Sequence, residues 1–284
     1  MFKKIFFVTA LLLASLLNAK PVVIASIAPV EYLAKAVGGD KIEVQSLAKG
    51  DVHSYEPKPN DMKAVAKARI FIAAGLEFEE AWIPRFKASA KNLVVVKSDA
   101  KIAKLKEERG EQAEHDEKHE AHADPHVWLN PMLAITMARN ISDALIDMDK
   151  ANKDFYLENF QKLMNDLLAF DESAKNELAG LKNRKFVVYH PAWGYFAEHY
   201  DLEQISIERN GKEPKIDEMA STLKMIKDEN IKVIFADPNR SQKSAQILAS
   251  QTGAKVELLD PLGYNLLENL KIAVGAIKDA NSPK

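Results

Sequence analysis

One stretch, Phe186-Val187-Val188-Tyr189-His190-Pro191, contains the pattern that decides the fold of this chain. Four consecutive apolar or aromatic residues indicate a strand that is buried on both faces, and such strands belong to parallel sheets covered by helices. Similar short runs recur, separated by segments of helical length. They are Val22–Ala25, Ile42–Val44, Ile70–Ala73, Leu93–Val96, Gln204–Ile207, Val233–Ala236 and Val256–Leu259. The sequence therefore predicts an α/β fold of two lobes, each a four-stranded, mainly parallel sheet flanked by helices.

Between the two sets of strands lies a stretch with the periodicity of one long helix, from about Ala151 to Ala179. Its apolar residues recur every three or four positions and form a single stripe. They are Tyr156, Phe160, Leu163, Leu167, Phe170, Ala174 and Leu178, with Leu181 continuing the series. Neither proline nor glycine interrupts the stretch before Gly180, where a left-handed C-cap is expected. A helix of this length spans roughly 45 Å, so we expect it to join the two lobes rigidly.

The first 19 residues have the form of a secretory signal peptide. Two lysines precede an apolar run from Ile5 to Leu17, and Ala19 provides the small residue at the expected cleavage point. The apolar run is shorter than the ~20 residues of a transmembrane helix, which leaves an uncleaved anchor as the weaker alternative. We therefore expect a periplasmic protein. The expected parts are the signal peptide at 1–19, an N-terminal α/β lobe at 20–148, a linking helix at 149–181 and a C-terminal α/β lobe at 182–284.

The composition excludes several classes of protein. Of the 284 residues, 47% are hydrophobic and 28% are charged, as in ordinary globular proteins. Lysine and arginine (39) nearly balance aspartate and glutamate (41), so the chain lacks the basic surplus of a nucleic-acid-binding protein. The absence of cysteine excludes disulfides, thiolate zinc sites and iron–sulfur clusters.

Residues 104–124 interrupt the α/β pattern. This segment holds eight carboxylates, three histidines and four basic residues, with Leu105 as its one large apolar side chain. Such a segment buries too little apolar surface to offset the entropy of ordering, so we expect an acidic, mobile loop. Its histidines are His115, His119 and His122, whose spacing by four and three would put them on one face of a helix. They are candidates for an auxiliary metal site, and the alternative is a solvated loop without function.

Four residues outside this loop are candidate metal ligands. His53 lies in a turn-rich segment after the second strand, and His126 shortly precedes a helix that Asn130 and Pro131 should start. His190 and Asp260 each follow a strand and precede a proline. Ligands of open α/β sheets bind beyond the carboxyl ends of the strands, and three imidazoles with one carboxylate suit Zn²⁺. Spacing alone leaves open that each is a structural turn residue.

The chain resembles the zinc- and manganese-specific solute-binding proteins of bacterial ABC importers over nearly all of its mature length. The motifs that carry the resemblance are His53-Ser54-Tyr55-Glu56-Pro57, Asp124-Pro125-His126-Val127-Trp128-Leu129-Asn130-Pro131, Tyr189-His190-Pro191-Ala192-Trp193-Gly194-Tyr195-Phe196, Glu213-Pro214 and Leu259-Asp260-Pro261-Leu262-Gly263. The resemblance implies two lobes bridged by a long helix, with a metal between them at His53, His126, His190 and Asp260. Histidine at the third of these positions is typical of zinc members, whereas manganese members typically have glutamate.

The function that the resemblance implies is capture of Zn²⁺ in the periplasm and delivery to an ABC permease in the inner membrane. The protein is expected to be a monomer that is not an enzyme and has no nucleic-acid partner. The alternatives are a manganese- or iron-binding protein of the same transporter type, a metal-dependent adhesin or storage protein, and a zinc hydrolase. Asp260 argues against the hydrolase, because a fourth protein ligand leaves no position for an activated water. The ordinary pKa of imidazole, about 6.5, implies that zinc affinity falls below about pH 6.

Overall fold

The computed structural model describes residues 20–106, 123–208 and 216–281 of the chain. The predicted signal peptide and most of the acidic segment, including His115, His119 and His122, lie outside these residues. In the first lobe the strands are β1 (Val22–Ala25), β2 (Glu43–Ser46), β3 (Ile70–Ala73) and β4 (Val94–Lys97). The helices of this lobe are α2 (Ala28–Gly38), α3 (Pro59–Val65), α4 (Glu77–Ser89), the 3₁₀ turn η2 (Val127–Leu129) and α5 (Pro131–Met148).

The second lobe repeats this plan. Its strands are β5 (Lys185–Val188), β6 (Glu203–Ser206), β7 (Val233–Ala236) and β8 (Lys255–Leu258). Its helices are α7 (Gly194–His199), α8 (Ile216–Asp228), α9 (Lys243–Thr252) and α10 (Leu266–Asn281). All eight strands that the sequence predicts are present, each within two residues of its expected bounds, and the predicted fold class is confirmed.

Both sheets are parallel and have the same order of strands, β2-β1-β3-β4 and β6-β5-β7-β8. In each sheet the second strand in sequence lies on one side of the first, and the third strand lies on its other side. The strand order therefore reverses between the two central strands. Open α/β sheets bind ligands at this switch point, beyond the carboxyl ends of the strands. His190 lies just beyond the end of the central strand β5, and so is close to the switch point of the second sheet.

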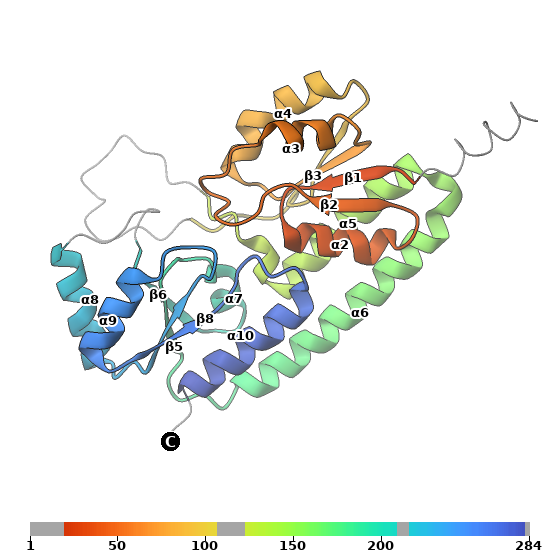
Figure 1. Cartoon of the computed structure of the whole chain (residues 1–284). Coiled ribbons are helices and arrows are strands. Elements are labelled where there is room, and N and C mark those ends of the chain that lie inside the picture. The colour runs from red at the N-terminus through yellow and green to blue at the C-terminus, as the bar shows by residue number, and fades with distance from the viewer. Residues whose placement is uncertain (1–19, 107–122, 209–215, 282–284) are drawn as a thin grey trace, which may run out of the picture.

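One long helix, α6 (Lys153–Leu178), runs along both lobes (Figure 1). A 3₁₀ turn, η3 (Lys150–Asn152), leads into it from α5. It packs against α2 and α5 in the first lobe and against α10 in the second. The apolar stripe is buried along the whole helix, from Tyr156 to Leu178. Gly180 does not form the expected left-handed cap, and the guanidinium of Arg184 instead donates to the carbonyl of Leu178 at 3.2 Å.

The hydrophobic core continues from the first lobe through α6 into the second. The same cluster of buried side chains contains Ile24 of β1, Leu167 of α6 and Phe186 of β5. A second, smaller cluster covers the other face of the second sheet, and Val187 points into it because side chains alternate along a strand. Because one hydrophobic core extends through both lobes, the same packing that stabilises each lobe also stabilises their relative arrangement.

Within the described residues, no helix has both the length and the apolar character that crossing a bilayer requires.

Candidate metal centre

Three connections bring histidines to the region between the lobes. His53 lies in the connection between β2 and α3, and His126 lies directly before η2. The helix after η2 begins as the sequence predicts, because the side chain of Asn130 accepts the backbone N–H groups of Met132 and Leu133 at 2.9 and 3.3 Å. His190 follows β5, which hydrogen bonds to the neighbouring strands hold in place. Regular secondary structure therefore adjoins His126 and His190, whereas His53 lies within a longer connection.

The three histidine rings lie together. One nitrogen from each of His53, His126 and His190 falls within 4.8 Å of the other two, and the ring centroids are 5.0–5.4 Å apart. His126 and His190 are buried, and His53 is half-buried. The Nε2 atoms of His53 and His190 are buried and have no hydrogen-bond partner in the described part of the chain. Buried polar atoms without partners are unfavourable unless a ligand satisfies them, so this cluster is suited to a metal ion.

A buried carboxylate orients the ring of His126. The Oδ1 atom of Asp124 lies 2.7 Å from Nδ1 of His126 and accepts the backbone N–H of the same residue at 2.9 Å. A carboxylate beside Nδ1 keeps the proton on that nitrogen and leaves Nε2 free to bind metal. Asp124 therefore fixes both the backbone and the tautomer of a candidate ligand.

His190 has an equivalent carboxylate partner. The Oε2 atom of Glu208, just beyond β6, lies 2.7 Å from Nδ1 of His190. The guanidinium of Arg240 donates to the same oxygen at 2.6 Å and also contacts Nδ1 of His190 at 2.5 Å. Donation of the Nδ1 proton to Glu208 would leave the lone pair of His190 on Nε2, the buried atom without a partner in the described residues.

Arg240 also links the two lobes. Its second terminal nitrogen lies 3.6 Å from the Oδ2 atom of Asp51, in the first lobe. Asp51 in turn accepts the backbone N–H of His53 at 3.2 Å and the hydroxyl of Ser54 at 3.1 Å, which orders the loop that carries His53. Burial favours a higher pKa for Asp51, but Arg240 and these hydrogen bonds together hold its pKa below the usual value. One guanidinium thus contacts the carboxylates that support two of the histidines.

Burial keeps the imidazoles of His53 and His190 neutral. The pKa of His53 falls from its ordinary value of 6.5 to about 3, because burial disfavours the charged ring and His126, His190 and Arg240 add repulsion. The pKa of His190 is likewise well below its ordinary value, again mainly through burial. Neutral imidazole is the form that binds metal. For His53 and His190 we therefore expect protons to compete with zinc only at a lower pH than the ordinary imidazole pKa implies.

Asp260 is not part of the group of mutually close ligand atoms in the described residues. Its Oδ1 atom accepts hydrogen bonds from the side chain of Asn239 at 2.8 Å and from the backbone N–H of Leu262 at 2.9 Å. Its role as a fourth ligand stays a prediction. His199, which the sequence does not assign to the site, lies elsewhere, with its Nε2 atom 2.6 Å from a carboxylate oxygen of Asp171.

Sequence reasoning missed Asp124, Glu208 and Arg240, which contact the candidate ligands. A signal existed for Asp124, because an aspartate two positions before a histidine can reach both its backbone N–H and its ring. Glu208 and Arg240 come from connections that the fold brings to His190 across 18 and 50 positions of the chain. Single-sequence reasoning has no means of pairing such distant residues.

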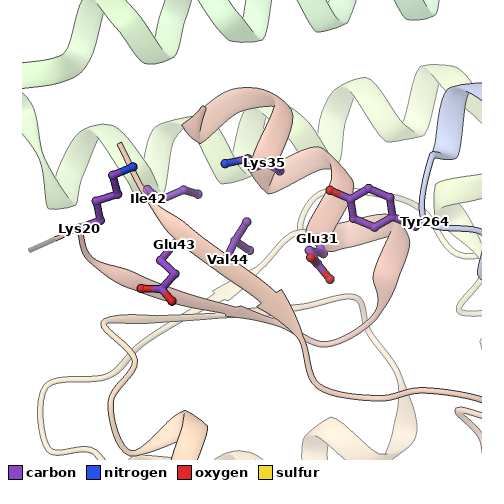
Figure 2. A pocket seen from close by; sticks show the side chains of 7 residues that line it. All are labelled: Lys20, Glu31, Lys35, Ile42, Glu43, Val44 and Tyr264. Carbon is purple, nitrogen blue, oxygen red and sulfur yellow. The ribbon is translucent and has the colours of Figure 1, made fainter. Parts of the chain in front are cut away.

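The structure also contains a large pocket that is separate from His53, His126 and His190. It has a volume of about 430 Å³ and lies beside the edge strand β2 and the helix α2. Figure 2 shows the charged side chains of Lys20, Lys35 and Glu43 around it, with Tyr264 at one end. None of the three histidines lines this pocket. Its size alone therefore does not make it the functional site.

Substitution of Asp124 tests the orientation of His126. We expect Asp124→Asn to weaken zinc binding about tenfold, because the amide no longer holds the proton on Nδ1 as a carboxylate does. Competition titration against a chelator of known affinity measures the change. Asp143→Asn is the matched control, since Asp143 is an exposed residue of α5 that pairs only with Arg139 in the described contacts. Equal affinities of the two variants would contradict the role of Asp124.

Known proteins that are similar to this chain are named for zinc uptake. The family model for the periplasmic component A of the zinc-uptake complex, ZnuA, matches residues 23–280. The high-affinity zinc uptake system protein ZnuA of Bacillus subtilis (strain 168) is 30% identical over 279 residues, which cover 91% of this chain and 86% of that protein.

Two solved structures are similar over the whole fold. A crystal structure of ZnuA has a TM-score of 0.87 and 34% identity, and the match covers 93% of this chain and 100% of that one. A ZnuA deletion mutant with zinc bound has a TM-score of 0.86 and 34% identity, over 94% of this chain and 100% of that one. The chain therefore belongs to the ZnuA family of periplasmic zinc-uptake components.

Proposed function

We propose that this protein captures one Zn²⁺ in the periplasm and delivers it to the permease of an ABC-type importer. The observation that carries the proposal is the convergence of His53, His126 and His190 between two lobes, with buried and unpartnered Nε2 atoms on His53 and His190. The zinc-uptake relatives support the identity of the cargo and the type of transporter. His53, His126 and His190 are the proposed protein ligands.

The chemistry of the donors favours zinc over manganese. Three neutral imidazoles form a nitrogen-rich set, which Zn²⁺ accepts in tetrahedral geometry. Mn²⁺ prefers oxygen donors, and the nearby carboxylates of Asp124 and Glu208 are directed to the histidine Nδ1 atoms instead. Iron also binds imidazole nitrogens, so it is the alternative cargo. A metal-competition titration distinguishes iron from zinc.

We further propose that Asp260 completes the zinc coordination. The residue that follows it, Pro261, lines a small cavity together with His190. The carbonyl of Pro261 also accepts the indole N–H of Trp128, close to His126, at 2.7 Å. The connection that carries Asp260 is thus held against both lobes beside the triad. A carboxylate ligand would balance part of the zinc charge and close the coordination shell, so we propose binding without catalysis.

Metal content and uptake test this function together. Protein isolated from the periplasm should contain one equivalent of zinc by elemental analysis, with little manganese or iron. A strain that lacks the protein should grow poorly under zinc limitation, and the wild-type chain should restore growth where His126→Ala does not. Zinc content with normal growth of the deletion strain would favour a storage protein or an adhesin. Manganese as the dominant metal would overturn the proposed cargo.

The histidines at 115, 119 and 122 are proposed to form a weaker, auxiliary zinc site. They lie outside the described residues, and the chain on either side of them comes together: Asp124 donates its backbone N–H to the carbonyl of Leu105 at 2.9 Å, and Lys106 pairs with Ala123. Because the ends are adjacent, a short glycine linker can replace residues 107–122 without displacing the lobes.

This deletion separates the two proposed sites. We expect the deleted protein to keep one tight zinc site, since none of the main ligands is removed, and to lose any weaker additional zinc. Zinc stoichiometry and competition titration measure both. Loss of the tight site in a variant that remains folded by circular dichroism would mean that the segment supplies a main ligand.

A further inference from the structure

Tyr195 connects the second lobe to the candidate ligand His126. It lies in the first turn of α7, and its ring is buried, with 2% of its surface exposed. Its hydroxyl accepts the backbone N–H of Leu105 at 2.8 Å and donates to the backbone carbonyl of Asp124 at 2.8 Å. Leu105 and Asp124 belong to the first lobe, so this single hydroxyl joins the lobes at two points. Its proton is retained at ordinary pH, because burial raises the pKa of Tyr195 to about 12.

The residue that Tyr195 contacts is the one that orients His126. Asp124 is buried, and its carboxylate binds both the ring and the backbone N–H of His126. Its backbone N–H is bound to Leu105, the other partner of the tyrosine hydroxyl. The position of Asp124 therefore depends on contacts from both lobes, and the ring of His126 depends on Asp124.

Gly194 permits this close approach. A Cβ atom on Gly194 would lie 3.1 Å from the Oδ2 atom of Asp124, closer than such contacts usually are. The backbone carbonyl of Tyr195 also accepts the side-chain amide of Asn130 at 3.3 Å, beyond the other end of η2. The start of α7 thus contacts the segment around His126 on both sides of the histidine.

We infer that Tyr195 is a positioning residue, which holds Asp124 in place and thereby sets the geometry in which His126 binds zinc. The inference rests on the proposed function and deepens it. Through this hydroxyl, the second lobe determines how tightly a ligand of the first lobe is held. Loss of the hydroxyl should allow Asp124 to shift, so that His126 dissociates from zinc more easily and release accelerates.

A pair of tyrosine substitutions tests the inference. Tyr195→Phe should increase the rate of zinc dissociation about fivefold, somewhat less than loss of a direct partner of a metal ligand. Tyr156→Phe is the matched control. Its ring is fully buried in α6, and its hydroxyl donates at 3.0 Å to Asp149, at the end of α5. Both variants remove the hydroxyl of a buried tyrosine that donates to an aspartate residue, so only an effect on zinc binding separates them.

Three readouts keep a positioning role apart from a structural one. Tyr195→Phe should change the visible spectrum of the Co²⁺-substituted protein, whereas Tyr156→Phe should not. In an Asp124→Ala background, Tyr195→Phe should add no further change in dissociation rate, because the residue through which it acts is gone. Gly194→Ala keeps the hydroxyl of Tyr195 but places a methyl group too close to the carboxylate of Asp124, and should also accelerate the dissociation of zinc.

An unchanged dissociation rate in Tyr195→Phe, or an effect that adds fully to that of Asp124→Ala, would overturn the inference. If Tyr195→Phe does not fold, the test is carried out with Gly194→Ala. A zinc dissociation rate equal to that of the wild type in Gly194→Ala would then overturn the inference. Wild-type protein that binds no zinc would instead overturn the proposed function, so the two failures are distinguishable.

Discussion

Substitution of His190 by alanine is expected to weaken zinc binding about 100-fold. Structural zinc sites with four protein ligands bind with about 10–16 kcal/mol, so one ligand contributes about 3 kcal/mol, which corresponds to a factor of roughly 100. His126→Ala should have a similar effect, because both rings are buried and oriented by carboxylates, and one nitrogen of each lies within 4.8 Å of the other. Competition with chelators of graded affinity measures the loss.

His199→Ala is the matched control for this series. It removes an imidazole of the same lobe, but the described partner of His199 is Asp171 in α6. Its zinc affinity should equal that of the wild type. A His190→Ala variant that binds zinc as tightly as His199→Ala would contradict the proposed triad.

Asp260→Ala extends the same experiment to the proposed fourth ligand. A loss close to that of His190→Ala is expected, because a carboxylate contributes both a ligand bond and charge to the site. A loss smaller than threefold would remove Asp260 from the coordination shell. It would leave the residue with the hydrogen bonds from Asn239 and Leu262 that the structure contains.

The second large effect is a loss of stability of the metal-free protein at acidic pH. His53 has a pKa of about 3 in the folded protein and an ordinary pKa of 6.5. Between these values the unfolded chain binds a proton that the folded protein does not, so stability is complete above pH 6.5 and is lost as the pH falls toward 3. From pH 7 to pH 5 His53 alone should lower the free energy of unfolding by about 2 kcal/mol. His190 acts in the same direction.

Urea unfolding in the presence of a chelator, at pH 7 and pH 5, measures this effect. The carboxylates of the protein also titrate in this range, so the comparison is with His53→Ala, which should lose less stability between the two pH values. Equal losses in wild type and His53→Ala would show that His53 is not kept neutral by the fold. Saturating zinc should reduce the loss in the wild type, because bound metal stabilises the folded state.

The sequence predicts most of the fold because its signals are local. Val233–Ala236 is a buried strand whose four apolar residues can be recognised without their partners. The stripe from Tyr156 to Leu178 has a helical period and is buried as expected. The start of α5 follows from Asn130, whose side chain caps the helix. In each case the residues that determine the element lie within it or beside it.

The features that sequence reasoning misses depend on partners distant in the chain. Gly180 is not a left-handed cap, and the carbonyl of Leu178 accepts the backbone N–H of Leu181 together with the guanidinium of Arg184, six positions further along the chain. The order of strands within each sheet also cannot be derived from the burial of single strands. The three histidines could be proposed from their positions after strands, but their supporting groups could not. Glu208 and Arg240 reach His190 only after the second sheet has formed.

The most direct test of the central claim is X-ray absorption spectroscopy of the zinc-loaded protein with residues 107–122 replaced by a glycine linker. This variant retains the proposed main ligands and lacks the three histidines of the acidic segment. We expect one zinc ion with three imidazole nitrogens at about 2.0–2.1 Å and one oxygen donor. A shell with one imidazole or none, in folded protein that holds one zinc, would contradict the account.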